Sequence, residues 1–205
     1  MDWLKLVEST QHCQRNWDFE KTIPDGTIDW LFDIGYAMPT KQNQPSVQIV
    51  AFKSRSSISL MSEMAYEPKN ESPNSGKINN PQTNAPLLFA FIKRKDLLLH
   101  SSGSTIDTEI GLTSGAIALA ANSIGLKTGF CACINDKGDI SKKLKKLLSS
   151  KNIKIKEIRL LLGVGYPKEG WPSNQSESTM FPSYSKDANK HYPNFLPDIE
   201  KKIIL

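Results

Sequence analysis

The stretch that decides the fold is Glu109–Asn135, EIGLTSGAIALAANSIGLKTGFCACIN. From 110 to 124 nearly every residue is apolar or small, without proline or charge, which predicts a core helix. At helical spacing, one face holds Leu112, Ala116, Leu119 and Ser123, and another holds Ile110, Ile117, Ala121 and Ile124. We therefore expect protein to cover both flanks of this helix. Gly125 and Leu126 then supply a helix stop, and 129–134 predicts a short buried strand or a turn into one.

Length and composition predict one soluble domain over residues 1–205. The chain is 39% hydrophobic and 23% charged, with a formal charge of +5, which is ordinary for a globular protein. No apolar run approaches the roughly 20 residues of a membrane span, and the first residues lack the apolar run of a signal peptide. Three cysteines do not suggest a disulfide framework. We expect a cytoplasmic protein that does not enter membranes.

The rest of the chain predicts helices and strands on both sides of that core helix. Helices are expected at 2–12, at 58–65, from a start within 22–25 to Met38, and from Asp139 to Leu148. In the last of these, Ile140, Leu144, Leu147 and Leu148 form a stripe that we expect to be buried. Strands are expected at 47–53, 87–92 and 158–164, and the unbroken apolar character of the last two is typical of central strands. We expect a mobile loop or lid at 67–84 and an extended C-terminal tail at 168–205.

Common catalytic and binding motifs do not occur. His12, His100 and His191 are far apart, and no nucleophile elbow, Walker loop or Rossmann fingerprint occurs. Cys131 and Cys133 indicate small buried thiols more than a metal site, so no metal is predicted. The lysines between 142 and 156 favour a solvated helix face over a nucleic-acid site, since aromatic residues are not interleaved with them.

Polar, mostly uncharged segments stand at the ends of the expected core elements. They are Gln14–Asn16, Thr40–Asn43, Asn79–Gln82 and Gly129–Cys131. Arginine and lysine can bind a phosphate, while asparagine and glutamine can hydrogen-bond ring carbonyls and nitrogens. This inventory suits a heterocycle with a phosphate tail.

Four landmarks, in order, resemble those of the FMN-dependent nitroreductase family. Arg15–Phe19 resembles the Arg-Ser-containing flavin-phosphate segment, and Ala37–Pro45 resembles the Ala-Pro-Ser-x-x-Asn-x-Gln-Pro loop. Ser123–Gly129 resembles the Leu-Gly-Leu-x-Thr-Gly end of the dimer-core helix, and Leu162–Pro167 resembles the late strand with its Gly-Tyr-Pro turn. Cys13 and Trp17 depart from the family, because basic residues usually occupy those positions.

The resemblance implies an α+β, three-layer fold: a central, mostly antiparallel sheet flanked by helices, in an intertwined homodimer with an extended tail. It implies FMN sites at the interface, lined by both subunits. One subunit would supply Gln14, Arg15 and Asn16, and the other Pro39, Thr40, Lys41 and Asn43. Asn80 and Gln82 would contact the ring's polar edge, Phe130 and Cys131 would lie near flavin N5, and Lys190, or else Lys186, would reach the phosphate.

The implied activity is hydride transfer from NADH or NADPH through flavin N5 to a nitroaromatic, a quinone or a similar conjugated acceptor. The flavin carries the chemistry, so no catalytic side chain is required. Within the same fold, a reductive dehalogenase or a flavin-destroying enzyme is an alternative. Cys13 and Trp17 motivate another alternative, a flavin-binding or structural dimer without turnover. A nucleic-acid-binding protein that uses the lysine cluster is a third, less favoured, alternative.

Overall fold

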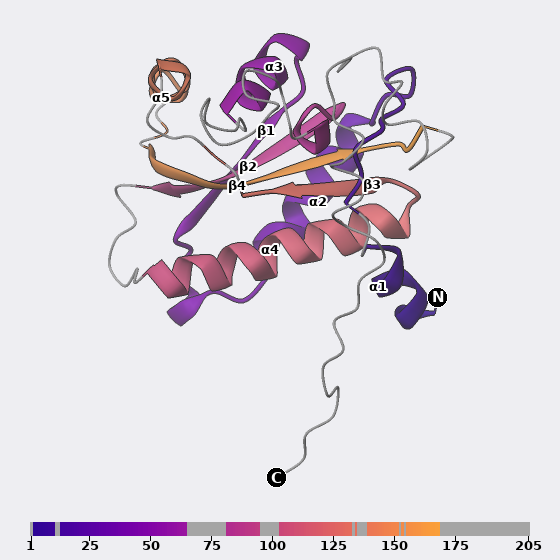
Figure 1. The fold of residues 1–205 in the computed structure, drawn as a ribbon. Helices are drawn as coiled ribbons and strands as arrows, with labels where there is room; N and C mark the ends of the chain where they lie inside the picture. The colour runs from indigo at the N-terminus through magenta and orange to yellow at the C-terminus, as the bar shows by residue number, and fades with distance from the viewer. Residues whose placement is uncertain are drawn as a thin grey trace, which may run out of the picture.

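A computed structural model of the chain describes residues 2–10, 13–64, 81–94, 103–132, 134, 139–151, 153 and 155–168. Figure 1 shows helices around one sheet. The helices are α1 (Trp3–Ser9), α2 (Asp25–Tyr36), α3 (Arg55–Met64), α4 (Gly103–Ser123) and α5 (Asp139–Ser149), with 3-10 turns η1 (Lys41–Asn43) and η2 (Pro81–Thr83). The strands are β1 (Val47–Phe52), β2 (Leu87–Arg94), β3 (Lys127–Cys131) and β4 (Ile155–Gly165). Most of the predicted loop at 67–84 and of the tail at 168–205 lies outside the described residues.

The four strands form one antiparallel sheet in the order β1-β2-β4-β3. The prediction that 87–92 and 158–164 are central strands is confirmed, because β2 and β4 each have a strand on both sides. In β2, Leu87, Phe89 and Phe91 join one core, while Leu88, Ala90 and Ile92 join another. Successive side chains of a strand point to opposite faces, so the unbroken apolar run fills both cores.

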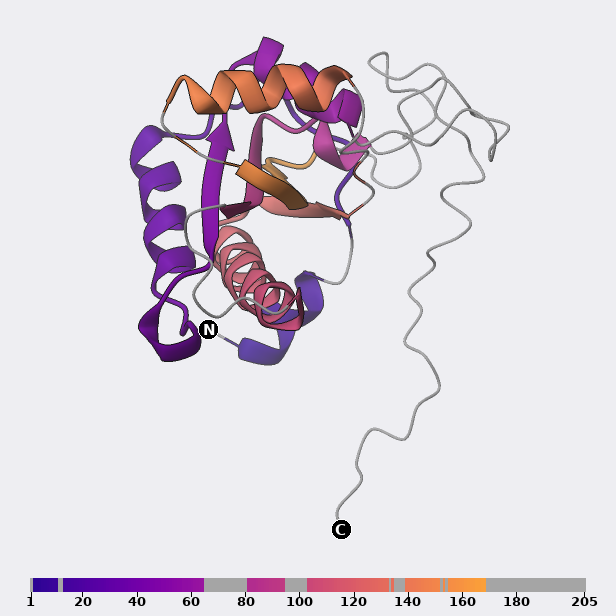
Figure 2. The same cartoon turned by 90° about the vertical axis from the view of Figure 1, so that its left-hand side faces the viewer.

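Helices cover both faces of the sheet, which confirms the predicted α+β class and its three layers. α2 and α4 lie on one face, and α3 and α5 lie on the other (Figures 1 and 2). The first core includes Leu31 of α2 and Ile117 of α4. The second includes Met61 of α3 and Leu144 of α5. The predicted helix from 22–25 to Met38 is confirmed as α2, which buries Ile28, Leu31 and Gly35.

The described chain covers helix α4 on one flank, so a single chain supplies half of the predicted cover. Ile117 and Ala121 are fully buried, whereas Leu112 on the other face is 40% exposed. A Cβ atom added at Gly111 or Gly115 would meet no atom within 4 Å. The outer face of the central helix is therefore an apolar surface that nothing in the described chain covers.

Apolar residues of α1 and α5 are partly exposed, which for α5 corrects the predicted buried stripe. Asp2 does cap α1, because its Oδ1 accepts from the Leu4 amide at 3.1 Å. However, Trp3 is 67% and Val7 is 45% exposed, so α1 does not bury its apolar residues in this chain. In α5, Leu147 is 43% exposed, because only the Leu144 and Leu148 side of the stripe faces the second core. Among the described segments, no helix combines the length and apolar character that a bilayer span requires.

Candidate functional site

Residues 13 and 14 lie along the outer edge of β3, and residues 16–18 pair with 166–168 after the end of β4. The Gln14 amide donates to the Thr128 carbonyl at 2.8 Å, and Cys13 Sγ lies 3.7 Å from the Phe130 carbonyl oxygen. In an antiparallel ladder, alternate residues direct their backbone groups toward and away from the partner strand. Thr128 and Phe130 therefore direct their backbone groups away from β4, and the edge of β3 presents the Phe130 amide outward.

Arg15 is the charged residue of this edge, and Cys13 lies beside it. Burial raises the pKa of the Cys13 thiol, while the neighbouring Arg15 guanidinium lowers it by charge and hydrogen bonding to a smaller extent. The thiol is therefore protonated near neutral pH. The structure places the Arg15 cation partly buried beside the β3 edge, where an anionic group could approach.

Trp17 stands where the nitroreductase family usually has a basic residue, and in this chain it has a structural role instead. Its side chain is 3% exposed, and its Nε1 donates to the Pro81 carbonyl at 3.0 Å. Its backbone also pairs with Pro167 in an isolated bridge. Trp17 thus joins the first segment to η2 and to the end of β4, and a buried indole cannot contribute a charge to phosphate binding.

Two glycines on neighbouring strands bring η2 onto the sheet. Gly129 of β3 and Gly163 of β4 lie opposite each other in the ladder. A Cβ atom at either position would clash with Gln82, at 2.5 Å from its Cβ in the case of Gly129. The side-chain-free patch lets the η2 backbone lie directly on the strands, which places Gln82 beside Gln14 and β3.

Other predicted ligand residues of this segment are already used inside the chain. Gln14 is 3% exposed, and its Nε2 donates to the Asn16 carbonyl. That carbonyl also accepts from the Lys168 amide at 3.1 Å, and Asn16 is 7% exposed. The side chain of Cys131 is buried in the second core. These residues shape the edge, while Arg15 and the Phe130 amide are better placed to meet a ligand.

A groove lies between this edge and helix α4, and we call it the β3–α4 groove. Its volume is about 450 Å³, and it is lined by Asp107, Ile110, Gly111, Ser114, Gly115, Phe130, Ala132, Arg159 and Leu160. Arg159 donates to Asp107 at 2.7 Å and to Glu157 at 2.7 Å, and these bonds raise its pKa. Because two carboxylates already neutralise Arg159, Arg15 is the better candidate to bind an anion.

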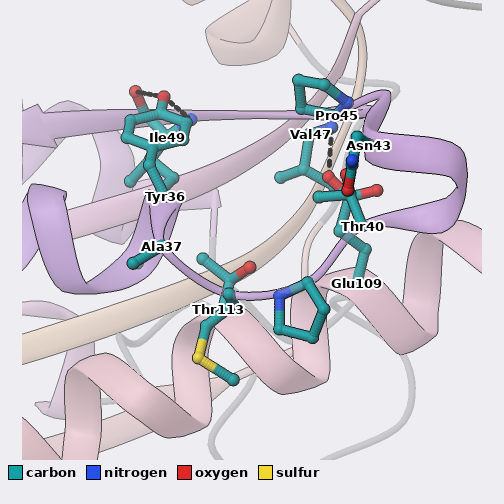
Figure 3. A pocket seen from close by; sticks show the side chains of 12 residues that line it. Tyr36, Ala37, Thr40, Asn43, Pro45, Val47, Ile49, Glu109 and Thr113 are labelled. Atoms are coloured by element: carbon teal, nitrogen blue, oxygen red, sulfur yellow. Dashed lines mark hydrogen bonds between the residues drawn. The ribbon is translucent and has the colours of Figure 1, made fainter.

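The proline loop lines a second cavity, which we call the proline-loop pocket (Figure 3). Its volume is about 480 Å³, and its lining includes Pro39, Thr40 and Asn43 from the predicted set, but not Lys41. Glu109 and Thr113 of α4 form another wall. Glu109 Oε1 accepts from the amides of Ser46 at 2.9 Å and Val47 at 3.2 Å.

The two groups of predicted ligand residues lie at opposite edges of the sheet. The proline loop leads directly into β1, whereas residues 13 and 14 flank β3. With β2 and β4 between them, the two edge strands are separated by about 14 Å. One chain therefore brings together Gln14, Arg15, Asn16, Gln82 and Phe130, but not the proline loop. Asn80, Lys186 and Lys190 lie outside the described residues.

The sequence matches neither a protein-family model nor a curated protein. Solved structures, in contrast, are similar over most of their length. An FMN-dependent nitroreductase from Clostridium difficile has a TM-score of 0.65 at 18% identity, covering 83% of this chain and 93% of that chain. A nitroreductase with bound FMN from Bacteroides fragilis has a TM-score of 0.65 at 15% identity, covering 83% and 90%. A nitroreductase family protein from Clostridium novyi has a TM-score of 0.62 at 15% identity, covering 86% and 91%.

The chain has the nitroreductase fold. This confirms the fold that the four sequence landmarks predicted. Within this fold, sequence reasoning missed Glu109 and Thr113, which wall the proline-loop pocket, and Tyr36, whose hydroxyl accepts from the Ile49 amide at 3.0 Å. No clear sequence signal marked Glu109, because Asp107 lies in the same helix. Tyr36 gave no signal either, because an aromatic residue near a helix end is common.

Among the described residues, no group of three or more His, Cys, Asp or Glu could hold a metal ion. One buried polar atom near the β3 edge, Thr128 Oγ1, has no hydrogen-bond partner. A buried hydroxyl without a partner costs free energy in the chain alone. The edge of β3 is therefore a place where an additional donor or acceptor would be favourable.

Proposed function

We propose that this protein is an FMN-dependent oxidoreductase that works as a homodimer. The observation that carries the proposal is the β3–α4 groove, because one wall is an edge strand with an outward Phe130 amide and another contains Gly111 and Gly115. Open space above two glycines, one helical turn apart, leaves room for a flat ring. The fold of FMN-dependent nitroreductases supports the same ligand class.

The donor set along the β3 edge fits FMN, and Phe130 is the member of that set that also lines the groove. The Arg15 guanidinium supplies a fixed positive charge for the phosphate, and guanidinium–phosphate pairs are among the stronger hydrogen bonds in proteins. We propose that the Phe130 amide donates to flavin N5 and that Gln82 contacts the polar edge of the ring. Gln14 and Asn16 act by fixing the path of the segment around Arg15, since the side chain of Gln14 bonds to the Asn16 carbonyl.

The second half of each site would come from the partner subunit. The loop residues Pro39, Thr40, Lys41 and Asn43 cannot reach the β3 edge of their own chain, because two strands intervene. The uncovered face of α4, with Leu112 at 40% exposure and open space above Gly111 and Gly115, supplies an apolar surface for a second copy. Trp3 and Leu4 of α1, each 67% exposed, are further apolar residues that a partner could cover.

Bound FMN would supply two-electron hydride chemistry. The donor, NADH or NADPH, would lose a hydride and become NAD⁺ or NADP⁺, and the acceptor would gain the two electrons and a proton. We propose a nitroaromatic, a quinone or a similar conjugated molecule as the acceptor. The chain's own contribution is to hold the phosphate at Arg15, to donate from the Phe130 amide and to leave an apolar slot along α4.

The proposal is tested by reducing the FMN-loaded protein anaerobically with NADH and, separately, with NADPH. Loss of the oxidised-flavin absorption, followed by its return when a quinone or nitroaromatic is added, is the expected result. If the protein binds FMN and neither nucleotide reduces it, the flavin-binding dimer without turnover is the better account. A protein that fails to bind FMN contradicts the proposal.

A substitution tests the phosphate assignment separately. Arg15→Ala removes a charged hydrogen-bond donor, an effect of about 1.5–3 kcal/mol, so FMN should bind roughly 10- to 150-fold more weakly. Lys53→Ala is the matched control, because Lys53 is an exposed cation near the other edge of the sheet, paired with Asp25. Equal FMN affinity in the Arg15 variant and the control would refute the role of Arg15.

A further inference from the structure

Glu109 is a buried carboxylate that holds the chain where the proline loop ends. It is 5% exposed, and its two oxygens lie 2.9 and 3.1 Å from the Ser46 amide nitrogen. Its Oε1 also accepts from the Val47 amide at 3.2 Å. Among the described residues Glu109 forms no ion pair, and its hydrogen-bond partners are the backbone amides of Ser46 and Val47.

The loop that Glu109 holds has an unfavourable backbone conformation. Gln42 and Asn43 have φ angles of 57° and 55°, the left-handed region that residues other than glycine rarely adopt. Two such residues in succession persist only where the surrounding contacts fix them. Pro39 and Pro45 restrict the two ends, and the carboxylate of Glu109 fixes the residue that follows Pro45.

Figure 3 shows Glu109 and Asn43 next to each other at one end of the proline-loop pocket, with Thr40 alongside. Thr40 and Asn43 are the loop residues that the proposed function assigns to flavin binding. Glu109 therefore contacts the end of this loop through the backbone amides of Ser46 and Val47.

We propose that Glu109 is a positioning residue for flavin binding, and that it acts on the site of the partner subunit. This inference rests on the proposed function. The carboxylate fixes the amides of Ser46 and Val47, which keeps the strained loop in the conformation that presents Thr40 and Asn43 outward. Because the loop cannot reach the β3 edge of its own chain, each Glu109 serves the FMN that the other subunit's Arg15 holds.

The first test measures FMN affinity in Glu109 variants that remain dimeric. Glu109→Ala removes both acceptors, and FMN should bind about tenfold or more weakly, the usual loss for a hydrogen bond to a charged group. Glu109→Gln keeps a carbonyl acceptor at the Oε1 position, so its affinity should lie within about threefold of the native protein. Asp29→Ala, an exposed acid on α2, is the control and should leave the affinity unchanged.

A mixed dimer separates the proposed role from a loss of folding. One subunit carries Glu109→Ala and the other carries Arg15→Ala, and two different affinity tags isolate the heterodimer. If the loop serves the partner's site, one site contains both substitutions and the other contains neither. The heterodimer should then bind one FMN with native affinity and one much more weakly. A general defect of the Glu109→Ala subunit would instead weaken the site that depends on its intact Arg15.

Three outcomes decide between the accounts. Native FMN affinity in homodimeric Glu109→Ala overturns the positioning role while leaving the proposed function intact. A heterodimer without any site of native affinity overturns the action across the interface. Failure of the native protein to bind FMN would contradict the proposed function itself, which makes the two failures distinguishable.

Discussion

Gly163→Ala tests how closely η2, which carries Gln82, packs on strand β4. A Cβ atom at position 163 would lie 1.9 Å from the Gln82 carbonyl oxygen and 3.0 Å from the Ala85 Cβ. The nearest atom belongs to the backbone, so no rotamer change can relieve the clash, and η2 must move away from β4. Overpacking of this kind costs about 1–3 kcal/mol. For a chain of this size, that corresponds to a fall in Tm of roughly 2–12 °C.

The assay is thermal unfolding of the FMN-free protein followed by circular dichroism, at one fixed protein concentration. Gly26→Ala is the matched control, because a Cβ atom there would meet nothing within 4 Å. Alanine in place of glycine in a helix should raise the stability of α2 by about 0.5–1 kcal/mol. A Gly163→Ala protein that melts at or above the native Tm would refute the close packing of η2 on β4.

Further substitutions test other parts of the account. Leu112→Lys places a charge on the uncovered face of α4 and should shift the protein from dimer to monomer in size-exclusion chromatography; an unchanged dimer would show that this face is not the interface. Trp17→Phe leaves the buried Pro81 carbonyl without its donor and should lower the free energy of unfolding in urea by about 1–3 kcal/mol. An unfolding midpoint equal to that of the native protein would contradict the structural role of Trp17. Gln42→Gly relieves the backbone strain of a left-handed residue and should raise the free energy of unfolding by about 1 kcal/mol in the same assay. A loss of stability would contradict the strain assigned to the loop.

The fold was predictable from the sequence because its strongest signals are local. The apolar runs of β2 and β4 fill two cores at once, as expected for central strands. The face of α4 that carries Leu112 was predicted to be covered, and in one chain it is not. Periodicity identifies an apolar face, but it does not tell whether the same chain or a second copy covers it.

The candidate site was predictable in its segments but less so in its individual residues. Gln14 and Asn16 have the donors and acceptors of a ligand site, yet the chain uses the Gln14 amide and the Asn16 carbonyl internally. Glu109 was missed because its partners are backbone amides, which carry no mark in the sequence. Side-chain chemistry can be inferred from residue types, whereas backbone donors become visible only when the strands are placed.

The central claim is that a dimer of this chain holds FMN between its subunits. The most direct measurement is light scattering coupled to size-exclusion chromatography, with flavin absorption recorded across the same peak after reconstitution with FMN. The account predicts a dimer that carries one FMN per chain. A monomer with FMN bound, or a dimer that excludes FMN, would contradict it.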